Sequence, residues 1–325
     1  MLNQAFVAPD TRVNPASPDG NTVAILLSTF NGERYLVEQL ESLIRQTHTN
    51  WVIYASDDGS SDSTLRILSE YRNKLGEHRL KIFPGPQKGF SANFLSLVRR
   101  PPADTPYYAF CDQDDIWVPE KLERALHWMC PITSGVPALY CSRTRLVDEG
   151  GSQLGFSPEF TEPLCFRNAL VQSIAGGNTM VFNRGTRELL AATSTATYIV
   201  SHDWWAYILV TGCGGQVRYD PQPQVDYRQH GNNLMGSNAS FKDRWARLQM
   251  LFSGTFREWN AANLAAIAPM RAQLTPECRQ TLQQFEQARN APLFTRFRLV
   301  LRSGLYRQTL QGNVGLLLAT LLRRF

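Results

Sequence analysis

Three features of the sequence predict an α/β fold, with a mostly parallel sheet flanked by helices. Short apolar runs alternate with segments of helical apolar spacing, and this strand-helix unit recurs about every 28 residues. Polar clusters follow the apolar runs, at the strand ends where such sheets bind ligands. Apolar residues make up 43% of the 325 residues and charged residues only 19%, which favours a large core over disorder.

The first two strand-helix units lie within residues 23–68. Val23–Leu27 is a continuous apolar run and predicts a buried strand. The next apolar residues fall at helical spacing: Leu36, Leu40, Leu43 and Ile44. Trp51–Ala55 predicts the second strand, and a helix through Leu65 and Leu68 follows it.

The third and fourth units lie within residues 80–129. Leu80–Phe83 predicts a strand, followed by helical spacing at Phe90, Phe94, Leu97 and Val98. Tyr107–Cys111 predicts the fourth strand, and Pro119 is well placed to open the helix through Leu122, Leu126 and Met129.

Polar clusters follow the first, second and fourth strands, at Ser28–Asn31, Asp57–Asp62 and Asp112–Asp115. The last of these places three carboxylates in four residues, which repel one another unless a cation or N–H donors lie among them. Mg²⁺ commonly pairs one or two carboxylates with substrate phosphates. A solvated acidic turn is the alternative, and repetition at three strand ends favours a ligand site.

Two common nucleotide-binding classes lack support. Neither Gly-x-Gly-x-x-Gly after the first strand nor a phosphate-binding Gly-Lys-Ser/Thr loop is present. The Asp57–Asp62 segment suits a turn and a helix cap. Its carboxylate could equally accept the N3–H of uracil or thymine.

Four ordered motifs, within about residues 22–235, carry a family resemblance: Leu27–Glu33, Ser56–Asp62, Lys88–Phe94 and Asp112–Asp115. The chain resembles the inverting family 2 glycosyltransferases of GT-A fold. Further segments are more similar to the bacterial rhamnosyltransferase branch of that family: Gln113, Ser201–Trp205 and Tyr227–Asn233.

The resemblance implies roles for individual residues of the donor site. The pyrimidine nucleotide would be held by Thr29, Asn31, Glu33 and Asp57. Asp112 and Asp114 match the Asp-x-Asp element that holds Mg²⁺ or Mn²⁺ on the sugar-nucleotide diphosphate. His230 would contact this metal or the diphosphate, or else serve a structural role. Asp115 would orient Asp114 or touch the donor sugar.

On the acceptor side, the resemblance implies that Asp203 is the general base, although it could simply cap a helix. The family usually has Glu-Asp at this position and this chain has His202-Asp203, which leaves the role of His202 open. Trp204 and Trp205 are candidates for stacking on sugar faces, with one of them expected in the core. Gly177 and Asn178 belong to a tight turn expected beside the acceptor cleft.

The C-terminal region is predicted to be helical from about residue 241. Aromatic and leucine side chains form one packing stripe: Trp245, Leu248, Phe252, Phe256 and Trp259. After Glu286 the chain has seven arginines and no acidic residue, so its net charge of +5 comprises +7 here and −2 elsewhere. With the leucines of residues 289–325, this charge predicts a peripheral helix or helix pair on an anionic membrane and argues against nucleic acid. The alternative is that these leucines cover a seam of the catalytic domain or a dimer partner.

Three segments are therefore expected: a loose tail at 1–20, a catalytic domain at 21–240, and a helical extension at 241–325 that is basic and amphipathic from about 289. Six scattered cysteines without zinc spacing indicate reduced thiols in a cytoplasmic enzyme. The expected location is peripheral, on the inner face of a bacterial inner membrane.

The functional prediction is a metal-dependent inverting transferase that moves a sugar from a nucleoside-diphosphate donor to a glycan or lipid-linked acceptor. The best specific match is L-rhamnose from dTDP-rhamnose, in bacterial surface polysaccharide synthesis. A nucleotidyltransferase acting on a sugar phosphate is the enzymatic alternative, and a non-catalytic glycan-binding module is the other. Neither accounts as well for Asp112, Asp114 and Asp203 together.

Overall fold

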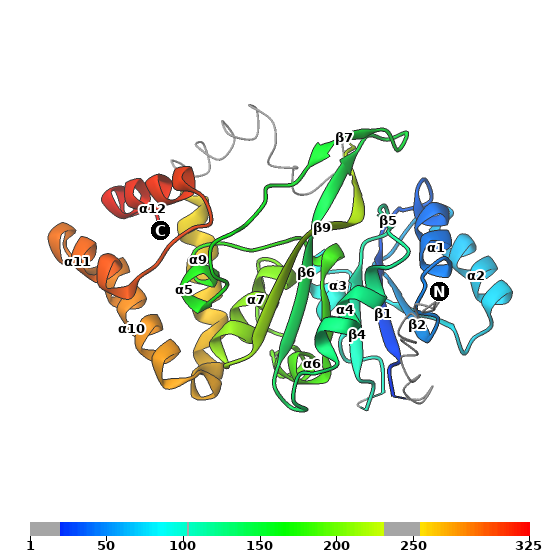
Figure 1. Cartoon of the computed structure of the whole chain (residues 1–325), viewed down its shortest axis with the longest axis horizontal. Helices are drawn as coiled ribbons and strands as arrows, with labels where there is room; N and C mark the ends of the chain where they lie inside the picture. Colours follow the sequence, from blue (N-terminus) through cyan, green and yellow to red (C-terminus); the bar gives the residue numbers. More distant parts are fainter. Residues whose placement is uncertain (1–19, 103, 231–253) are drawn as a thin grey trace, which may run out of the picture.

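A computed structural model describes residues 20–102, 104–230 and 254–325 (Figure 1). Its centre is one mixed sheet of nine strands. In chain order these are β1 (Val23–Thr29), β2 (Trp51–Asp57), β3 (Leu80–Pro84), β4 (Tyr107–Cys111), β5 (Ile116–Trp117), β6 (Ala138–Val147), β7 (Gln153–Phe156), β8 (Val181–Asn183) and β9 (Gln216–Arg228). The spatial order is β3-β2-β1-β4-β8-β6-β9-β5, with β7 paired to β6.

The predicted strands β1 to β4 form the parallel half of the sheet. β1 lies between β2 and β4, with Val23 opposite both Trp51 and Tyr107. β3 extends this half on the other side of β2. The α/β class and the four strands that begin it are thereby confirmed.

The other half of the sheet mixes strand directions and was not predicted as strands. β8 runs antiparallel to both β4 and β6, whereas β6 and β9 are parallel to each other. The register of β6 and β9 shifts between the pairs Ser142–Asp220 and Thr144–Val225. Pro221 and Pro223 lie in the part of β9 that this shift leaves out of the ladder, where a missing N–H costs no sheet hydrogen bond.

Helices cover both faces of the sheet. The predicted helices α1 (Leu36–Ile44), α2 (Thr64–Leu75) and α4 (Lys121–Met129) pack on one face. The predicted α3 (Phe90–Leu97) packs on the other face, with α5 (Phe166–Ala169), α6 (Arg184–Ala191) and α7 (His202–Gly212). Side chains of β1 alternate between the two faces of the sheet. Ile25 packs in the layer with α1, α2 and α4, and Leu26 in the layer with α3, α5, α6 and α7.

The described part of the C-terminal extension consists of helices joined by short loops. It contains α9 (Thr255–Ile267), a 3-10 turn (Ala268–Gln273), α10 (Pro276–Asn290), α11 (Leu293–Ser303) and α12 (Leu310–Leu322), which gather at one end of the molecule (Figure 1). Trp259 of α9 lies edge-on to Trp204 of α7, with 6.5 Å between ring centroids, and so packs as predicted. Trp245, Leu248, Phe252 and the expected boundary near residue 240 lie outside the described residues.

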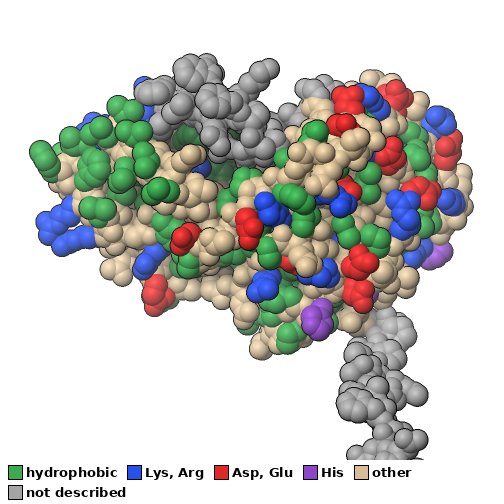
Figure 2. Space-filling view, turned by 45° about the horizontal axis from the view of Figure 1, so that its top comes forward, with side chains coloured by type: hydrophobic (Ala, Val, Ile, Leu, Met, Phe, Trp, Pro, Cys, Tyr) green, Lys and Arg blue, Asp and Glu red, His purple; other side chains and the backbone are tan. Residues whose placement is uncertain are grey.

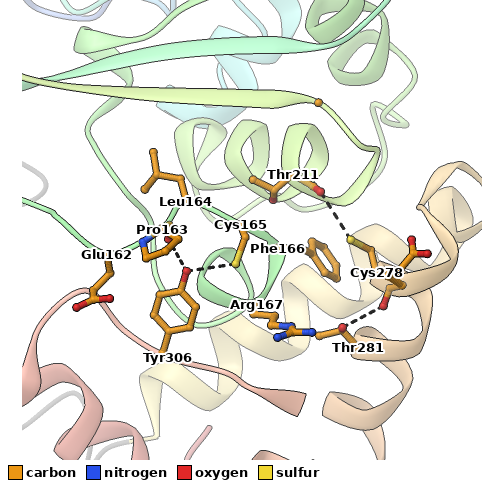
Figure 3. A pocket seen from close by; sticks show the side chains of 12 residues that line it. Glu162, Pro163, Leu164, Cys165, Phe166, Arg167, Thr211, Cys278, Thr281 and Tyr306 are labelled. Carbon is orange, nitrogen blue, oxygen red and sulfur yellow. Dashed lines mark hydrogen bonds between the residues drawn. The ribbon is translucent and has the colours of Figure 1, made fainter. Parts of the chain in front are cut away.

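A seam joins this extension to the sheet layer (Figure 3). The Tyr306 hydroxyl lies 3.2 Å from Sγ of Cys165 and also donates to the Pro163 carbonyl, while Asn168 Nδ2 donates to the Tyr306 carbonyl at 3.0 Å. A pocket of about 640 Å³ opens along the seam, lined from both sides by side chains including Arg167, Thr211, Cys278 and Thr281. This pocket lies at the C-terminal end of α7, away from the helix's first turn.

The last two helices each have an inner and an outer face. The Arg296 guanidinium is buried, donating to the Thr320 carbonyl at 2.9 Å and the Ala291 carbonyl at 2.8 Å. Phe325 packs on Phe285, with 5.7 Å between ring centroids. The extension is therefore partly a packed element, as the alternative expectation had it. No helix within the described ranges is both long enough and apolar enough to cross a bilayer.

Two adjacent leucines of α12 test whether this helix has a packed inner face and an exposed outer face. Leu316 is 6% exposed and Leu317 is 43% exposed. We expect Leu316→Ala to lower the free energy of unfolding by about 2 kcal/mol or more, because it leaves a cavity against the core. Leu317→Ala, the matched control, should change it by less than about 0.5 kcal/mol. Urea denaturation measures both, and equal effects would contradict the orientation of α12.

Candidate active site

The candidate site lies beyond the C-terminal ends of β1, β2 and β4. These strands are parallel neighbours, so the loops that follow them meet at one edge of the sheet. Residues 30–35 follow β1, residues 58–63 follow β2, and residues 112–115 follow β4. A short 3-10 turn (Gly177–Thr179) and the first turn of α7 border the same region, because the Gly177 N–H donates to Asp203.

The loops after β1 and β2 are joined by hydrogen bonds of Asn31 and Glu33, two side chains that were expected to bind the nucleotide. The Asn31 carbonyl oxygen Oδ1 accepts from the Ser61 N–H at 2.9 Å. The Glu33 carboxylate accepts from the Ser63 N–H at 2.9 Å, and the Glu33 N–H donates to Asp62 at 3.0 Å. Asn31 and Glu33 are exposed, so they form the rim of this double loop.

Thr29 and Asp57 form the floor beneath that rim, and both are buried. The Thr29 hydroxyl donates to Oδ2 of Asp57 at 2.9 Å. The same carboxylate accepts from the Ser60 hydroxyl at 2.5 Å and from the N–H groups of Gly59 and Ser60 at 3.2 and 2.9 Å. Four protein donors fill the acceptor capacity of a carboxylate. Asp57 therefore anchors its loop here, as the turn alternative supposed, and a nucleobase would have to displace a donor.

The acidic loop is tied to the first loop by Gln113. Its side-chain amide accepts from the Phe30 N–H at 2.8 Å and donates to the Phe30 carbonyl at 2.9 Å. A Cβ at Gly32 would lie 2.2 Å from Oε1 of Gln113, so only glycine fits beside this pair. The Phe30 ring remains 55% exposed next to the loops.

Carboxyl groups are crowded in the acidic loop. Burial, followed by the charges of Asp114 and Asp203, raises the pKa of Asp112 to about 8. Burial, with the charges of Asp114 and Asp112, raises the pKa of Asp115 well above its usual range. Like charges favour protonation of their neighbours, so each carboxyl raises the pKa of the next. The hydrogen bonds from Asn178 to Asp115 and from Gly177 to Asp203 show that the acidic loop and the first turn of α7 lie together.

Asp115 is enclosed by protein groups and does not face open space. It is 1% exposed and accepts from Asn178 Nδ2 at 2.5 Å and from the Arg228 N–H at 3.3 Å. The Lys121 ammonium donates to the Asn178 carbonyl at 2.7 Å, and burial lowers the pKa of Lys121 to about 7. Asp115 and Asn178 are therefore buried supports of the site, and this burial disfavours the sugar contact that was one of the two roles expected of Asp115.

Arg228 holds the acidic loop from the side of β9. Its side chain is buried and donates to the Asp114 carbonyl at 3.1 Å and the Glu149 carbonyl at 2.6 Å. It also pairs with Glu38 of α1, and its guanidinium lies 4.5 Å from the Tyr35 ring centroid. One arginine thus connects α1, the acidic loop and the turn between β6 and β7.

His230 lies at this loop. Its Nε2 lies 2.9 Å from Oδ2 of Asp114, and its ring stacks on Tyr35 at 5.3 Å between centroids. In the described part of the chain, Asp112, Asp114 and His230 do not form a ready-made three-ligand metal cluster. The donor set nevertheless fits a hard divalent ion, which needs only one or two carboxylates when phosphate oxygens complete its coordination.

Asp203 lies in the first turn of α7, one residue beyond the helix start. Its Oδ2 accepts from the Gly177 N–H at 3.2 Å, and its Oδ1 from the Trp204 N–H at 2.5 Å and the Ser201 hydroxyl. The N-cap residue is Ser201. Asp203 is half-buried, and its charge acts on the Asp112 carboxyl, so it faces the acidic loop.

Two neighbours of Asp203 belong to the core. His202 stacks on Phe94 at 4.0 Å between centroids and lies edge-on to Phe110, and burial lowers its pKa to about 4. Trp204 is 6% exposed and donates from Nε1 to the Ala169 carbonyl at 2.7 Å. Protein covers the Trp204 ring, which corrects the expectation of sugar stacking. Both ring nitrogens of His202 lack a partner among the described residues.

Sequence reasoning missed Lys121 and Arg228 as site residues. Lys121 follows Pro119-Glu120 at a helix start and reads as a surface lysine, although it is fully buried. Arg228 lies in a motif that was recognised, but its partners are 79 to 190 residues away in sequence. The sequence did offer one signal for Lys121, namely a basic residue close to the acidic motif Asp112–Asp115.

Comparison with known sequences identifies the family. Residues 24–146 match the sequence profile of glycosyl transferase family 2. The dTDP-rhamnosyl transferase RfbG of Shigella flexneri is 31% identical over 247 residues, which cover 71% of this chain and 81% of that protein. The chain is a family 2 glycosyltransferase.

Two further similarities extend this assignment. The glycosyltransferase is 29% identical over 111 residues to WfgD of Escherichia coli, a UDP-Glc:alpha-D-GlcNAc-diphosphoundecaprenol beta-1,3-glucosyltransferase, covering 34% of this chain and 42% of WfgD. Among solved structures, GalNAc-T7 with UDP, GalNAc and Mn²⁺ superposes with a TM-score of 0.53 at 13% identity, over 82% of this chain and 55% of that chain. The structural similarity confirms the GT-A fold.

The buried His202 predicts a defined pH dependence of stability. Its pKa falls from 6.5 to about 4 on folding, so between these pH values the unfolded chain binds a proton that the folded chain does not. The stability that neutral His202 contributes is present above pH 6.5 and is lost as pH falls towards 4, by about 3 kcal/mol.

In His202→Phe this pH-dependent loss of stability should be absent. Turnover should stay within about tenfold of wild type, because the ring is a packing element. Urea denaturation between pH 7 and 4 measures the difference from wild type. His127→Phe, at an exposed site on α4, is the control. A wild-type-like pH dependence in His202→Phe, or a loss of turnover far beyond tenfold, would contradict this role for His202.

Proposed function

We propose that this family 2 glycosyltransferase transfers L-rhamnose from dTDP-rhamnose, with inversion, to a glycan or lipid-linked saccharide in bacterial surface polysaccharide synthesis. One observation carries the proposal: the adjacent residues Gly177 and Asn178 bond Asp203 of α7 and Asp115 of the acidic loop, which brings Asp203 close to Asp112 and Asp114 although about 90 residues separate them. The similarity to RfbG supports the donor, and the similarity to WfgD supports a lipid-linked acceptor.

The nucleotide would lie over the double loop after β1 and β2. Thr29 and Asp57 support this surface from below, and Asn31 and Glu33 form its rim. The exposed Phe30 ring offers a flat apolar face between the nucleotide surface and the acidic loop. The loops hold each other before any ligand arrives, so little chain has to be ordered on binding.

Asp112 and Asp114, with His230 beside them, would hold a divalent cation, Mg²⁺ or Mn²⁺. When bound, such an ion offsets the negative charge that develops on the departing nucleoside diphosphate. Arg228 keeps the loop backbone in place by bonding the Asp114 carbonyl, and His230 orients the Asp114 carboxylate.

Asp203 would act as the general base. Displacement with inversion needs a carboxylate near the acceptor hydroxyl, which takes the proton as the oxygen attacks the anomeric carbon. The Gly177 N–H holds Oδ2 of Asp203, and only glycine fits here because a Cβ would lie 2.2 Å from Nε2 of His202. The neutral His202 packs behind the base and takes no proton from the acceptor in this mechanism.

Asn178 would couple the donor and acceptor sides. Its side chain bonds Asp115 of the acidic loop, its carbonyl accepts from Lys121, and the preceding residue Gly177 donates to Asp203. A shift of the acidic loop is therefore transmitted to the base through one short turn. Neither the nucleotidyltransferase nor the glycan-binding alternative gains a specific observation from this arrangement.

Donor binding tests the proposed ligand and the metal together. With Mn²⁺, dTDP-rhamnose at 100 times its Kd should raise Tm by about 4 °C, since a ligand of the folded state stabilises it by mass action. UDP-glucose should give a smaller shift. Asp114→Asn should abolish the part of the Tm rise that depends on Mn²⁺, because a neutral amide replaces an anionic ligand. Asp104→Asn, at an exposed site, is the control. An unchanged Mn²⁺-dependent shift in Asp114→Asn would refute the metal assignment.

Asp203→Asn separates binding from chemistry. The amide can still accept from the Gly177 N–H but cannot take a proton, so donor affinity should persist while turnover drops by about 100-fold or more. Titration calorimetry with dTDP-rhamnose and single-turnover transfer measure the two effects. Turnover near that of wild type would show that the base lies elsewhere.

A further inference from the structure

The last helix exposes most of its large apolar side chains and buries only a narrow side. Six apolar residues recur at i, i+4, i+7, i+8, i+11 and i+12 along α12, and each is 42% to 81% exposed: Leu310, Val314, Leu317, Leu318, Leu321 and Leu322. The buried side carries Leu316, Ala319 and Thr320. Residues 310–322 include no charged residue. A surface helix normally has the reverse arrangement.

The outer side of α11 combines apolar and basic residues. Phe294 is 89% exposed and Leu301 is 70% exposed. Arg298 falls between them at i+4, and Arg302 follows at the next i+4 step, both exposed. Figure 2 shows hydrophobic side chains gathered at the end of the molecule formed by these helices, with basic side chains at the border.

We propose that these two outer sides, the α11–α12 outer face, dock on an anionic lipid bilayer. Single exposed leucines are common, but a contiguous set on neighbouring helices marks an interaction surface. The leucines would enter the acyl boundary and the arginines would lie among anionic headgroups. This inference does not rest on the proposed donor or acceptor.

Charge favours a bilayer over a second copy of the chain. Residues 289–325 contain seven arginines and no acidic residue, and Arg298, Arg302 and Arg323 are exposed. A symmetric dimer through this face would pair the same patch with itself, so these arginines would approach one another without compensating carboxylates. An anionic bilayer supplies the missing negative charge.

The geometry favours docking on the surface over insertion across the bilayer. The 13 residues of α12 span about 20 Å, less than the roughly 30 Å hydrocarbon core. The buried Arg296 ties α11 to the Thr320 carbonyl of α12, so the outer face is formed before any contact with lipid. Such a preformed surface loses little chain freedom on binding.

Vesicle sedimentation with the full chain tests the proposal. Vesicles of phosphatidylglycerol and phosphatidylcholine should bind the protein at low salt, and vesicles of phosphatidylcholine alone should bind it far less. The double variant Leu317→Gln/Leu321→Gln should lose about tenfold or more in partitioning, because two leucines no longer enter the acyl boundary. Arg298→Gln/Arg302→Gln should reduce partitioning onto anionic vesicles by about fivefold for each arginine removed. This difference from wild type should vanish at high salt.

Leu65→Gln is the matched control, since Leu65 is 45% exposed on α2, outside the α11–α12 outer face. It should bind vesicles like wild type. All variants should keep wild-type Tm, since the changed side chains are exposed. No binding of the wild type to anionic vesicles at low salt would overturn the proposal. Concentration-dependent self-association in sedimentation velocity that the leucine variant abolishes would also overturn it, in favour of a second copy.

Discussion

Four carboxylates, Asp112, Asp114, Asp115 and Asp203, crowd the end of β4 and the first turn of α7, and their mutual repulsion constrains the structure around them. The pKa values of Asp112 and Asp115 are raised because neither burial nor neighbouring charge favours their ionised forms. Protein groups offset part of this effect: the Lys121 charge acts against the rise in the pKa of Asp112, and the Arg228 N–H donates to Asp115. The exposed side is left to Asp112, Asp114 and Asp203, where a cation and a substrate would supply the rest.

The buried supports explain why the site needs polar groups inside the core. Lys121 and Arg228 are both buried, and a buried charge is costly unless well-placed partners surround it. Here each has them: Lys121 bonds the Asn178 carbonyl and lies over the Trp117 ring, and Arg228 bonds two carbonyls and Glu38. These contacts hold loops from distant parts of the chain at fixed positions. The residues thereby contribute geometry to the site more than net stability.

The C-terminal extension divides its residues between packing and exposure. Arg296, Leu316 and Phe325 join the helices to each other and to α10, so the extension is built into the molecule. Its outer leucines contribute nothing to this packing. Because α12 buries only Leu316, Ala319 and Thr320 and exposes its other leucines and Val314, the arrangement favours contact with a second apolar phase over stability of the isolated chain.

Local sequence determined the parallel half of the sheet, its helices and the positions of the polar loops. The runs at β1, β2 and β4 are continuous and apolar, so burial on both faces could be inferred without knowing the partners. β6 and β9 escaped this reasoning because they mix polar and apolar residues and pair across some 80 residues of sequence. The resemblance to family 2 glycosyltransferases likewise pointed to Asp112, Asp114 and Asp203 before their proximity was known.

Tertiary structure alone decided which polar residues face the site. His202, Trp204, Asp115 and Asn178 lie in motifs that suggested ligand contact, yet core packing or internal hydrogen bonds enclose them. Lys121 and Arg228 looked ordinary and proved to be supports of the acidic loop. The physical reason is that residue type and helical or strand periodicity are local properties, whereas burial and hydrogen-bond partners depend on segments that meet only in the folded chain.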